Sequence, residues 1–316
     1  MLTGYCGTYA SPNGRGVYRF DFDERTGRLS GPELVFRARD AKCLCRTGGA
    51  LAAPVQEGER AGIALFAPDG RELAKNLFET KTGCYLLREG NRLYSANYHE
   101  GTVTVLDPET LAVLGCAEAG PEAGCHQVIS AGGLFLVPCL ELDEVRLYDG
   151  ALEQVGKLSF PAGTGPRHGV MDRAGRRLFL VSERSRQLFV FRAAGRDFVP
   201  AGTFPAADSG ECAAVRLSRD ERFLYVSTRG ADVLTVFRLR DCAAERVREL
   251  PCGGRHPRDF DLTPDGRWLL CLNRDSDNLV SFPVDRETGL PGAPAGELKI
   301  PTGSGILLPG DMEATI

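Results

Sequence analysis

The chain has little of what marks several common classes of protein. Its 316 residues include one Trp, three Met and four His, and no apolar run approaches the roughly 18–20 residues of a membrane-spanning helix. The first residues carry neither the basic segment nor the apolar stretch of a secretory signal peptide. A formal net charge of -4 gives no overall attraction to nucleic acid or to an anionic membrane. Affinity for an anion must therefore come from local placement of Arg.

Familiar catalytic and nucleotide-binding motifs are also missing. The sequence contains no P-loop, no dinucleotide-binding glycine pattern after a strand, no GxSxG and no HExxH. It has no EF-hand loop and none of the GH and WD dipeptides of WD40 repeats. We therefore predict neither a nucleotide cofactor nor a metal-dependent reaction.

The eleven cysteines are an odd number and form no CxxC pair. Most lie inside apolar runs, as Cys139 and Cys271 do, where a free thiol behaves as a small hydrophobic side chain. This usage predicts a reducing, cytoplasmic setting. A zinc site is not expected, because Cys43 and Cys45 alternate along a probable strand and no second ligand pair follows.

The informative feature that is present is a repeated hairpin, in which an apolar strand, a short polar turn and a second apolar strand follow one another. Successive copies are about 41 to 46 residues apart, a period typical of β-propellers. A further strand precedes and another follows the hairpin, so each unit has four strands. The copies lie at 5–22, 50–66, 92–106, 134–148, 176–191, 222–237 and 267–282. The pattern predicts an all-β, seven-bladed propeller.

The two ends of the chain complete this pattern. Nothing upstream of Met1 supplies an inner strand for the first unit, whereas residues 302–309 have the composition of one. We expect the N- and C-terminal strands to share one blade and close the ring, so that 1–316 is a single domain. The alternative, two stacked β-sandwiches, lacks a sustained period of this length.

In a propeller the first strand of each blade lines the central channel, so aligned positions of these strands can be compared. One position is occupied by Cys43, Cys84, Cys125, Arg167, Cys212 and Arg258. Two guanidinium groups thus replace small thiols, which is costly unless each meets an anion or a wet cavity. Arg167 and Arg258 are therefore candidates for binding a carboxylate or phosphate. The alternative is that each pairs with a structural acid, such as Asp259 or Asp261.

Two further positions carry candidate polar groups. His126 and His168 both fall one residue after the Arg/Cys position, and a neutral imidazole can exchange a proton near pH 7. His126 is the candidate acid–base group and His168 a candidate substrate-binding residue, although either could be structural. At the end of the second strands, Glu183 is a general base or an Arg partner. Asn97 and Asn273 are candidate sugar-binding residues or ordinary turn residues.

Several segments together resemble the lactonase family, which contains 6-phosphogluconolactonases and carboxy-muconate lactonizing enzymes. The matching segments are GTYAS, RLYSANY, GCHQV, GTGPRHGVMD, RLFLVSE, RFLYVSTRGAD, HPRDFDLTPDGRWLLCLN and DRETG, which span nearly the whole chain. The resemblance implies a seven-bladed propeller with no catalytic metal. It also implies a catalytic set of His126, Arg167, Glu183 and Arg258.

The activity implied by the resemblance is lactone hydrolysis, with 6-phosphogluconolactone of the pentose phosphate pathway as the expected substrate. The expected partner is thus a small anionic sugar lactone, bound by a monomer or weak homo-oligomer. One alternative is a muconate-type lyase that uses the same residues on a dicarboxylate. The other is a non-catalytic binding propeller, which the degenerate second unit favours and the paired channel Arg residues disfavour.

Overall fold

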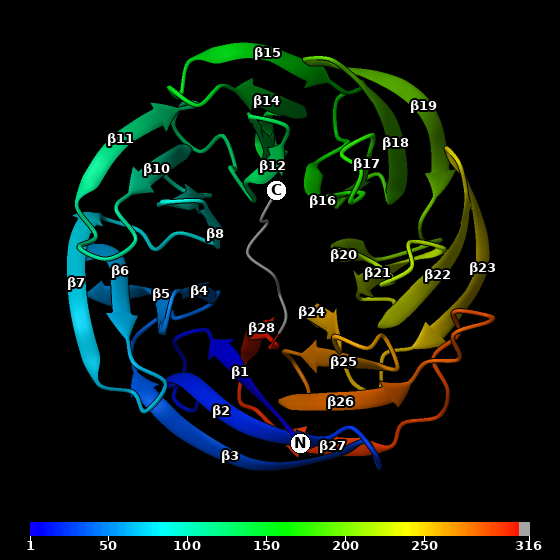
Figure 1. Ribbon diagram of the computed structural model, residues 1–316, viewed down its shortest axis with the longest axis horizontal. Helices are drawn as coiled ribbons and strands as arrows, with labels where there is room; N and C mark the ends of the chain where they lie inside the picture. Colours follow the sequence, from blue (N-terminus) through cyan, green and yellow to red (C-terminus); the bar gives the residue numbers. More distant parts are fainter. Residues whose placement is uncertain (310–316) are drawn as a thin grey trace.

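The strands pair into seven four-stranded antiparallel sheets, which stand around a central axis like the blades of a propeller (Figure 1). The computed structural model describes residues 1–309. The innermost strand of each blade faces the axis and the fourth forms the rim (Figure 1). The predicted seven-bladed architecture is confirmed, and the second unit forms a complete blade in spite of its degenerate sequence.

Blades 1 to 4 each place one strand at the axis and three progressively farther outward, in the following order. Blade 1 contains β28 (Gly303–Leu307), β1 (Leu2–Thr8), β2 (Gly16–Asp23) and β3 (Arg28–Arg37). Blade 2 contains β4 (Cys45–Thr47), β5 (Ala50–Glu57), β6 (Arg60–Phe66) and β7 (Glu72–Glu79). Blade 3 contains β8 (Tyr85–Glu89), β9 (Arg92–Asn97), β10 (Thr102–Leu106) and β11 (Val113–Glu118). Blade 4 contains β12 (Ile129–Ala131), β13 (Leu134–Cys139), β14 (Glu144–Tyr148) and β15 (Gln154–Ser159).

The other three blades follow the same plan. Blade 5 contains β16 (Pro166–Met171), β17 (Arg177–Ser182), β18 (Gln187–Ala194) and β19 (Asp197–Pro205). Blade 6 contains β20 (Glu211–Leu217), β21 (Phe223–Arg229), β22 (Val233–Arg240) and β23 (Ala243–Pro251). Blade 7 contains β24 (Pro257–Leu262), β25 (Trp268–Asn273), β26 (Asn278–Pro283) and β27 (Gly296–Lys299).

Ring closure occurs in blade 1, where β28 from the end of the chain pairs with β1 from its start. Tyr5 lies opposite Leu307 in this antiparallel pair. Blade 7 is joined to blade 1 by the indole Nε1 of Trp268, which donates to the carbonyl oxygen of Glu24 at 2.8 Å. The two ends of the chain therefore share blade 1 and close the ring there, as the sequence predicted.

Burial between neighbouring blades holds the ring together. One cluster joins Phe179 and Val190 of blade 5 to Leu224 and Phe237 of blade 6, and all four side chains are fully buried. Similar clusters fill the other blade interfaces. At roughly 25 cal/mol per Å² of buried apolar area, these interfaces supply the main driving force for closure.

Helix is nearly absent among residues 1–309. The single element is a 3-10 turn, η1 (Leu140–Leu142), and no helix of the described chain is long and apolar enough to cross a membrane. Asp143 ends η1 in the left-handed region with φ of 53°. Its carboxylate accepts hydrogen bonds from the backbone N–H groups of Gly163 at 2.8 Å and Gly165 at 2.7 Å. These bonds fix the loop that leads into β16.

One buried carboxyl group makes the stability of the fold depend on pH. Glu79 ends β7, and neither of its carboxylate oxygens has a hydrogen-bond partner. Burial, and then the nearby charge of Glu100, raise the pKa of Glu79 to about 8. The folded chain therefore keeps a proton that the unfolded chain loses near its ordinary pKa. It follows that this group lowers stability progressively as pH rises from the ordinary Glu pKa towards 8.

We expect Glu79→Gln, which cannot ionise, to raise the melting temperature at pH 9 by roughly 2 °C or more and to change it little near pH 4.5. Thermal denaturation followed by circular dichroism across this pH range measures the difference. Glu118→Gln, at an exposed position of β11, removes the same charge and serves as the control. A difference between Glu79→Gln and wild type that does not vary with pH would contradict this interpretation.

Candidate active site

A cavity of about 470 Å³ follows the axis of the ring and is lined by the innermost strands. Every blade places its innermost strand in the same direction, so the N-terminal ends of these strands meet at one mouth. We call this the catalytic mouth and define it by Tyr9, His126, His168, Arg167 and Arg258, all of which line the cavity. Ring closure thus gathers residues from the beginning, middle and end of the chain.

His126 and His168 are direct neighbours at this mouth. Nδ1 of His126 lies 3.1 Å from Nε2 of His168, and both side chains are buried. Burial first, and then the positive charge of Arg167, hold the pKa of each imidazole well below its ordinary value. Both rings are therefore neutral at pH 7. In the contact between them, one of the two nitrogens donates the hydrogen bond and the other accepts it. His168 thus orients His126.

Arg167 lies deepest, with 1% of its surface exposed. Its Nε donates to Glu183 at 2.8 Å and its Nη1 to the carbonyl oxygen of Ala213. Glu183 also forms an ion pair with Arg229, whose Nη2 lies 2.6 Å from Oε2 of Glu183. Burial would raise the pKa of Glu183, but these two guanidinium groups hold it below its ordinary value. Burial, followed by repulsion from Arg258, lowers the pKa of Arg167 to about 9, which still leaves it charged at pH 7.

Of the two roles considered for Glu183, the Arg partner fits its surroundings. Its carboxylate is ionised and shared by two cations, so it is a poor proton acceptor. Arg167 Nη2 has no hydrogen-bond partner among residues 1–309. The ion pair with Glu183 therefore holds the guanidinium of Arg167 in place, with its Nη2 free to donate at the catalytic mouth.

Arg258 has a different environment. Among residues 1–309 it forms no ion pair, and its guanidinium lies 5.7 Å from the ring centre of Tyr9. The structural acid considered as its partner, Asp259, instead accepts Arg216 Nη2 at 3.0 Å. Lys42 Nζ lies 6.0 Å from the same ring centre and likewise has no ion pair in the described chain. Lys42 and Arg258 thus lie beside the same ring at the catalytic mouth, and neither has an ion-pair partner within residues 1–309.

The structure does not bring Asn97 and Asn273 to the cavity. Both are fully buried and bonded locally. Asn97 Nδ2 donates to the Lys81 carbonyl at 2.7 Å, and Asn273 Nδ2 donates to the Cys252 carbonyl at 3.2 Å. Their side chains stabilise turns, which is the alternative that the sequence left open for asparagine at a strand end.

Sequence reasoning missed Tyr9 and Lys42 at this mouth. Burial would raise the pKa of Tyr9, but the charges of Arg258 and Lys42 lower it below its ordinary value. Tyr9 directly follows β1 as Glu183 directly follows β17, so its position in the repeat was the available signal. Lys42 precedes Cys43, and that adjacency to the aligned Cys/Arg position was the available signal.

The chain is similar to known proteins along nearly its whole length. The family model described as a lactonase, 7-bladed beta-propeller, matches residues 3–307. The chain belongs to the lactonase family. An uncharacterized protein of Staphylococcus epidermidis is 30% identical over 323 residues, which cover 92% of this lactonase-family chain and 94% of the relative.

Solved structures are similar to this lactonase-family propeller over almost its whole length. A protein of Lactobacillus plantarum has a TM-score of 0.91 and 26% identity, covering 97% of this chain and 99% of its own. A candidate 6-phosphogluconolactonase of Bacteroides fragilis has a TM-score of 0.87 and 25% identity, covering 97% of each chain. A periplasmic gluconolactonase of Pseudomonas aeruginosa has a TM-score of 0.88 and 25% identity, covering 97% and 98%.

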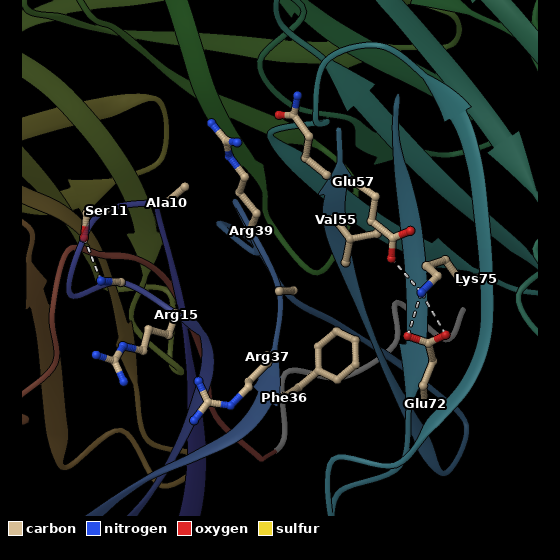
Figure 2. A pocket seen from close by; sticks show the side chains of 13 residues that line it. Ala10, Ser11, Arg15, Phe36, Arg37, Arg39, Val55, Glu57, Glu72 and Lys75 are labelled. Atoms are coloured by element: carbon tan, nitrogen blue, oxygen red, sulfur yellow. Dashed lines mark hydrogen bonds and ion pairs between the residues drawn. The ribbon is translucent and has the colours of Figure 1, made fainter. Parts of the chain in front are cut away.

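A second hollow of about 680 Å³ lies away from the axis, between blades 1 and 2 (Figure 2). Lys75 is held there by the carboxylates of Glu57 at 2.7 Å and Glu72 at 3.0 Å. Arg37 and Arg39 also line it, and both side chains are exposed. The residues that line this hollow include no His and no Cys. The axial cavity, with its paired imidazoles and buried Arg, is therefore the better candidate for lactone chemistry.

Proposed function

We propose that this lactonase-family protein is a carboxylic ester hydrolase that opens 6-phosphogluconolactone to 6-phosphogluconate, a step of the pentose phosphate pathway, in the cytoplasm. The observation that carries the choice of substrate is the pair of cations, Lys42 and Arg258, that face the catalytic mouth without an ion pair among residues 1–309. A phosphate group of the substrate would supply the missing counter-ion. The resemblance to structures described as lactonases supports the ester chemistry.

In the proposed mechanism His126 removes a proton from the attacking water. When His126 Nδ1–H donates to His168 Nε2, the other ring nitrogen, Nε2, carries a lone pair and can accept this proton. The water oxygen bonds to the lactone carbonyl carbon, and the carbonyl oxygen becomes negative. Arg167 Nη2 donates to this oxyanion while Glu183 holds the guanidinium in place.

The same imidazole completes the reaction. As the carbonyl re-forms, the bond between the carbonyl carbon and the ring oxygen breaks, and the proton on His126 passes to the leaving ring oxygen. Water is thus divided between the new carboxyl group and the new hydroxyl group, and His126 returns to its neutral state. No group other than water and the lactone is consumed.

The test compares lactones that differ only in their charge. Purified protein is assayed with 6-phosphogluconolactone and with gluconolactone, each corrected for spontaneous hydrolysis. We expect a kcat/KM at least about tenfold higher for the phosphorylated lactone, because the two free cations meet the phosphate. Arg258→Met should raise KM for the phosphorylated lactone and leave gluconolactone nearly unchanged.

Other outcomes assign a different function. Turnover of a muconolactone without turnover of either sugar lactone would indicate the lyase chemistry. Ligand-induced stabilisation with no turnover of any lactone would indicate a binding propeller. Equal kcat/KM values for the two sugar lactones would contradict the role given to Lys42 and Arg258 while leaving lactone hydrolysis intact.

A further inference from the structure

The C-terminal ends of the innermost strands meet at the other end of the axial cavity, which we call the opposite mouth. Arg167 stands near the start of β16, and β16 ends at Met171. At about 3.3 Å per residue, the strand separates the two mouths by roughly 13 Å. The residues that define the two mouths therefore lie at opposite ends of the innermost strands.

The opposite mouth is strongly basic. Guanidinium groups from blades 2, 3, 5 and 6 line the cavity at this end, namely Arg46, Arg88, Arg173, Arg216 and Arg219. Three acids lie beside these arginines in the described chain. Asp259 accepts Arg216 Nη2 at 3.0 Å, Glu89 accepts the hydroxyl of Ser130 at 2.9 Å, and Glu221 accepts the backbone N–H of Arg173 at 2.7 Å. Cations outnumber acids around this mouth, so its field favours an anion.

Two of these arginines, Arg46 and Arg173, indicate that this mouth binds a ligand. Arg46 lies over the ring of Tyr5, 5.8 Å from its centre, and its Nε is buried without a hydrogen-bond partner. Arg173 is exposed at the rim of the mouth and forms no ion pair within residues 1–309. Arg219 is different, because its side chain donates to the carbonyls of Leu262 at 2.6 Å and Thr263 at 3.2 Å. Arg219 is thus structural, whereas Arg46 and Arg173 remain available.

A buried donor without an acceptor costs free energy unless a ligand supplies one. Guanidinium groups that converge from several blades match the several acceptor oxygens of a phosphate group. We propose that the opposite mouth is a second anion-binding site, which takes a compact phosphate-bearing ligand independently of the lactone site. This proposal does not depend on the chain being a lactone hydrolase.

Binding is tested by isothermal titration calorimetry with pyrophosphate. Arg46→Gln/Arg173→Gln is expected to weaken binding at this site at least about tenfold. Arg258→Gln removes a cation from the catalytic mouth only. This variant therefore distinguishes pyrophosphate binding at the catalytic mouth from binding at the opposite mouth.

The matched control is Arg37→Gln/Arg39→Gln, which removes the same charge from the hollow between blades 1 and 2 (Figure 2). It should bind pyrophosphate as wild type does. Arg46→Gln/Arg173→Gln should also retain wild-type lactone turnover, whatever that turnover is. The proposal is overturned if the protein does not bind pyrophosphate, or if Arg46→Gln/Arg173→Gln binds it as tightly as wild type.

Discussion

Replacement of His126 by Gln should lower kcat for lactone hydrolysis by about 10²–10⁴-fold, with KM changed by less than about threefold. Gln keeps a polar side chain of similar reach but cannot take up a proton. The loss should therefore fall on the chemical step. Steady-state assays corrected for the spontaneous rate measure it, and turnover like that of wild type would remove His126 from the mechanism.

The pH profile distinguishes His126 from its neighbour. Burial, and then the charge of Arg167, lower the pKa of His126, so its neutral, active form persists below the ordinary His range. In wild type the acid limb of kcat/KM should therefore lie below pH 6.5. The two neighbouring imidazoles oppose each other's protonation, so His168→Gln should move the acid limb to higher pH. An unchanged limb would mean that His168 is structural only.

Glu183→Ala should have the largest effect on stability. It leaves Arg167, which is almost fully buried, and Arg229 without the carboxylate that they share. Breaking a buried ion pair in this way costs about 3–5 kcal/mol. Denaturation with urea at pH 7 measures the change. We also expect kcat to fall by about tenfold or more, because the donor edge of Arg167 is no longer held in place.

Glu211→Ala provides the matched control for this variant. Its carboxylate lies 3.1 Å from Nη2 of the same Arg229, but its side chain is 55% exposed. An exposed pair contributes about 0–1 kcal/mol, so the control should be close to wild type. The pKa of Glu183 is lowered in the folded chain, so its stabilising contribution is present above the ordinary Glu pKa and is lost as pH falls below it. Equal destabilisation by both variants would contradict the central role of Glu183.

The repeat made the fold predictable. A hairpin that recurs with a constant period cannot bury both faces alone, so copies must pack on one another, and a ring is the arrangement that leaves no end unpaired. The missing inner strand at the N-terminus and the surplus strand at 302–309 then fixed how the ring closes. These arguments needed only strand patterns and their spacing.

The same repeat also predicted part of the candidate site, because a residue that differs from those at the aligned positions of the other blades can be recognised. Arg167 and Arg258 were visible against Cys at the other aligned positions. Asn97 and Asn273 were not distinguishable from turn residues, since a sequence does not reveal whether an amide bonds to backbone or to a ligand. Tyr9 follows β1 as Glu183 follows β17, but the sequence did not show that Lys42 and Arg258 would lie beside its ring.

The sequence by itself determined the seven-bladed ring, its closure and the direction in which each inner strand presents its residues to the axis. Only the tertiary structure decided which charges are neutralised. Glu183 pairs with Arg167 and Arg229, whereas Arg258 and Lys42 have no ion pair within residues 1–309. The physical reason is that strand periodicity is a local property of the chain, whereas pairing, burial and pKa depend on distances of a few ångströms between blades that are far apart in sequence.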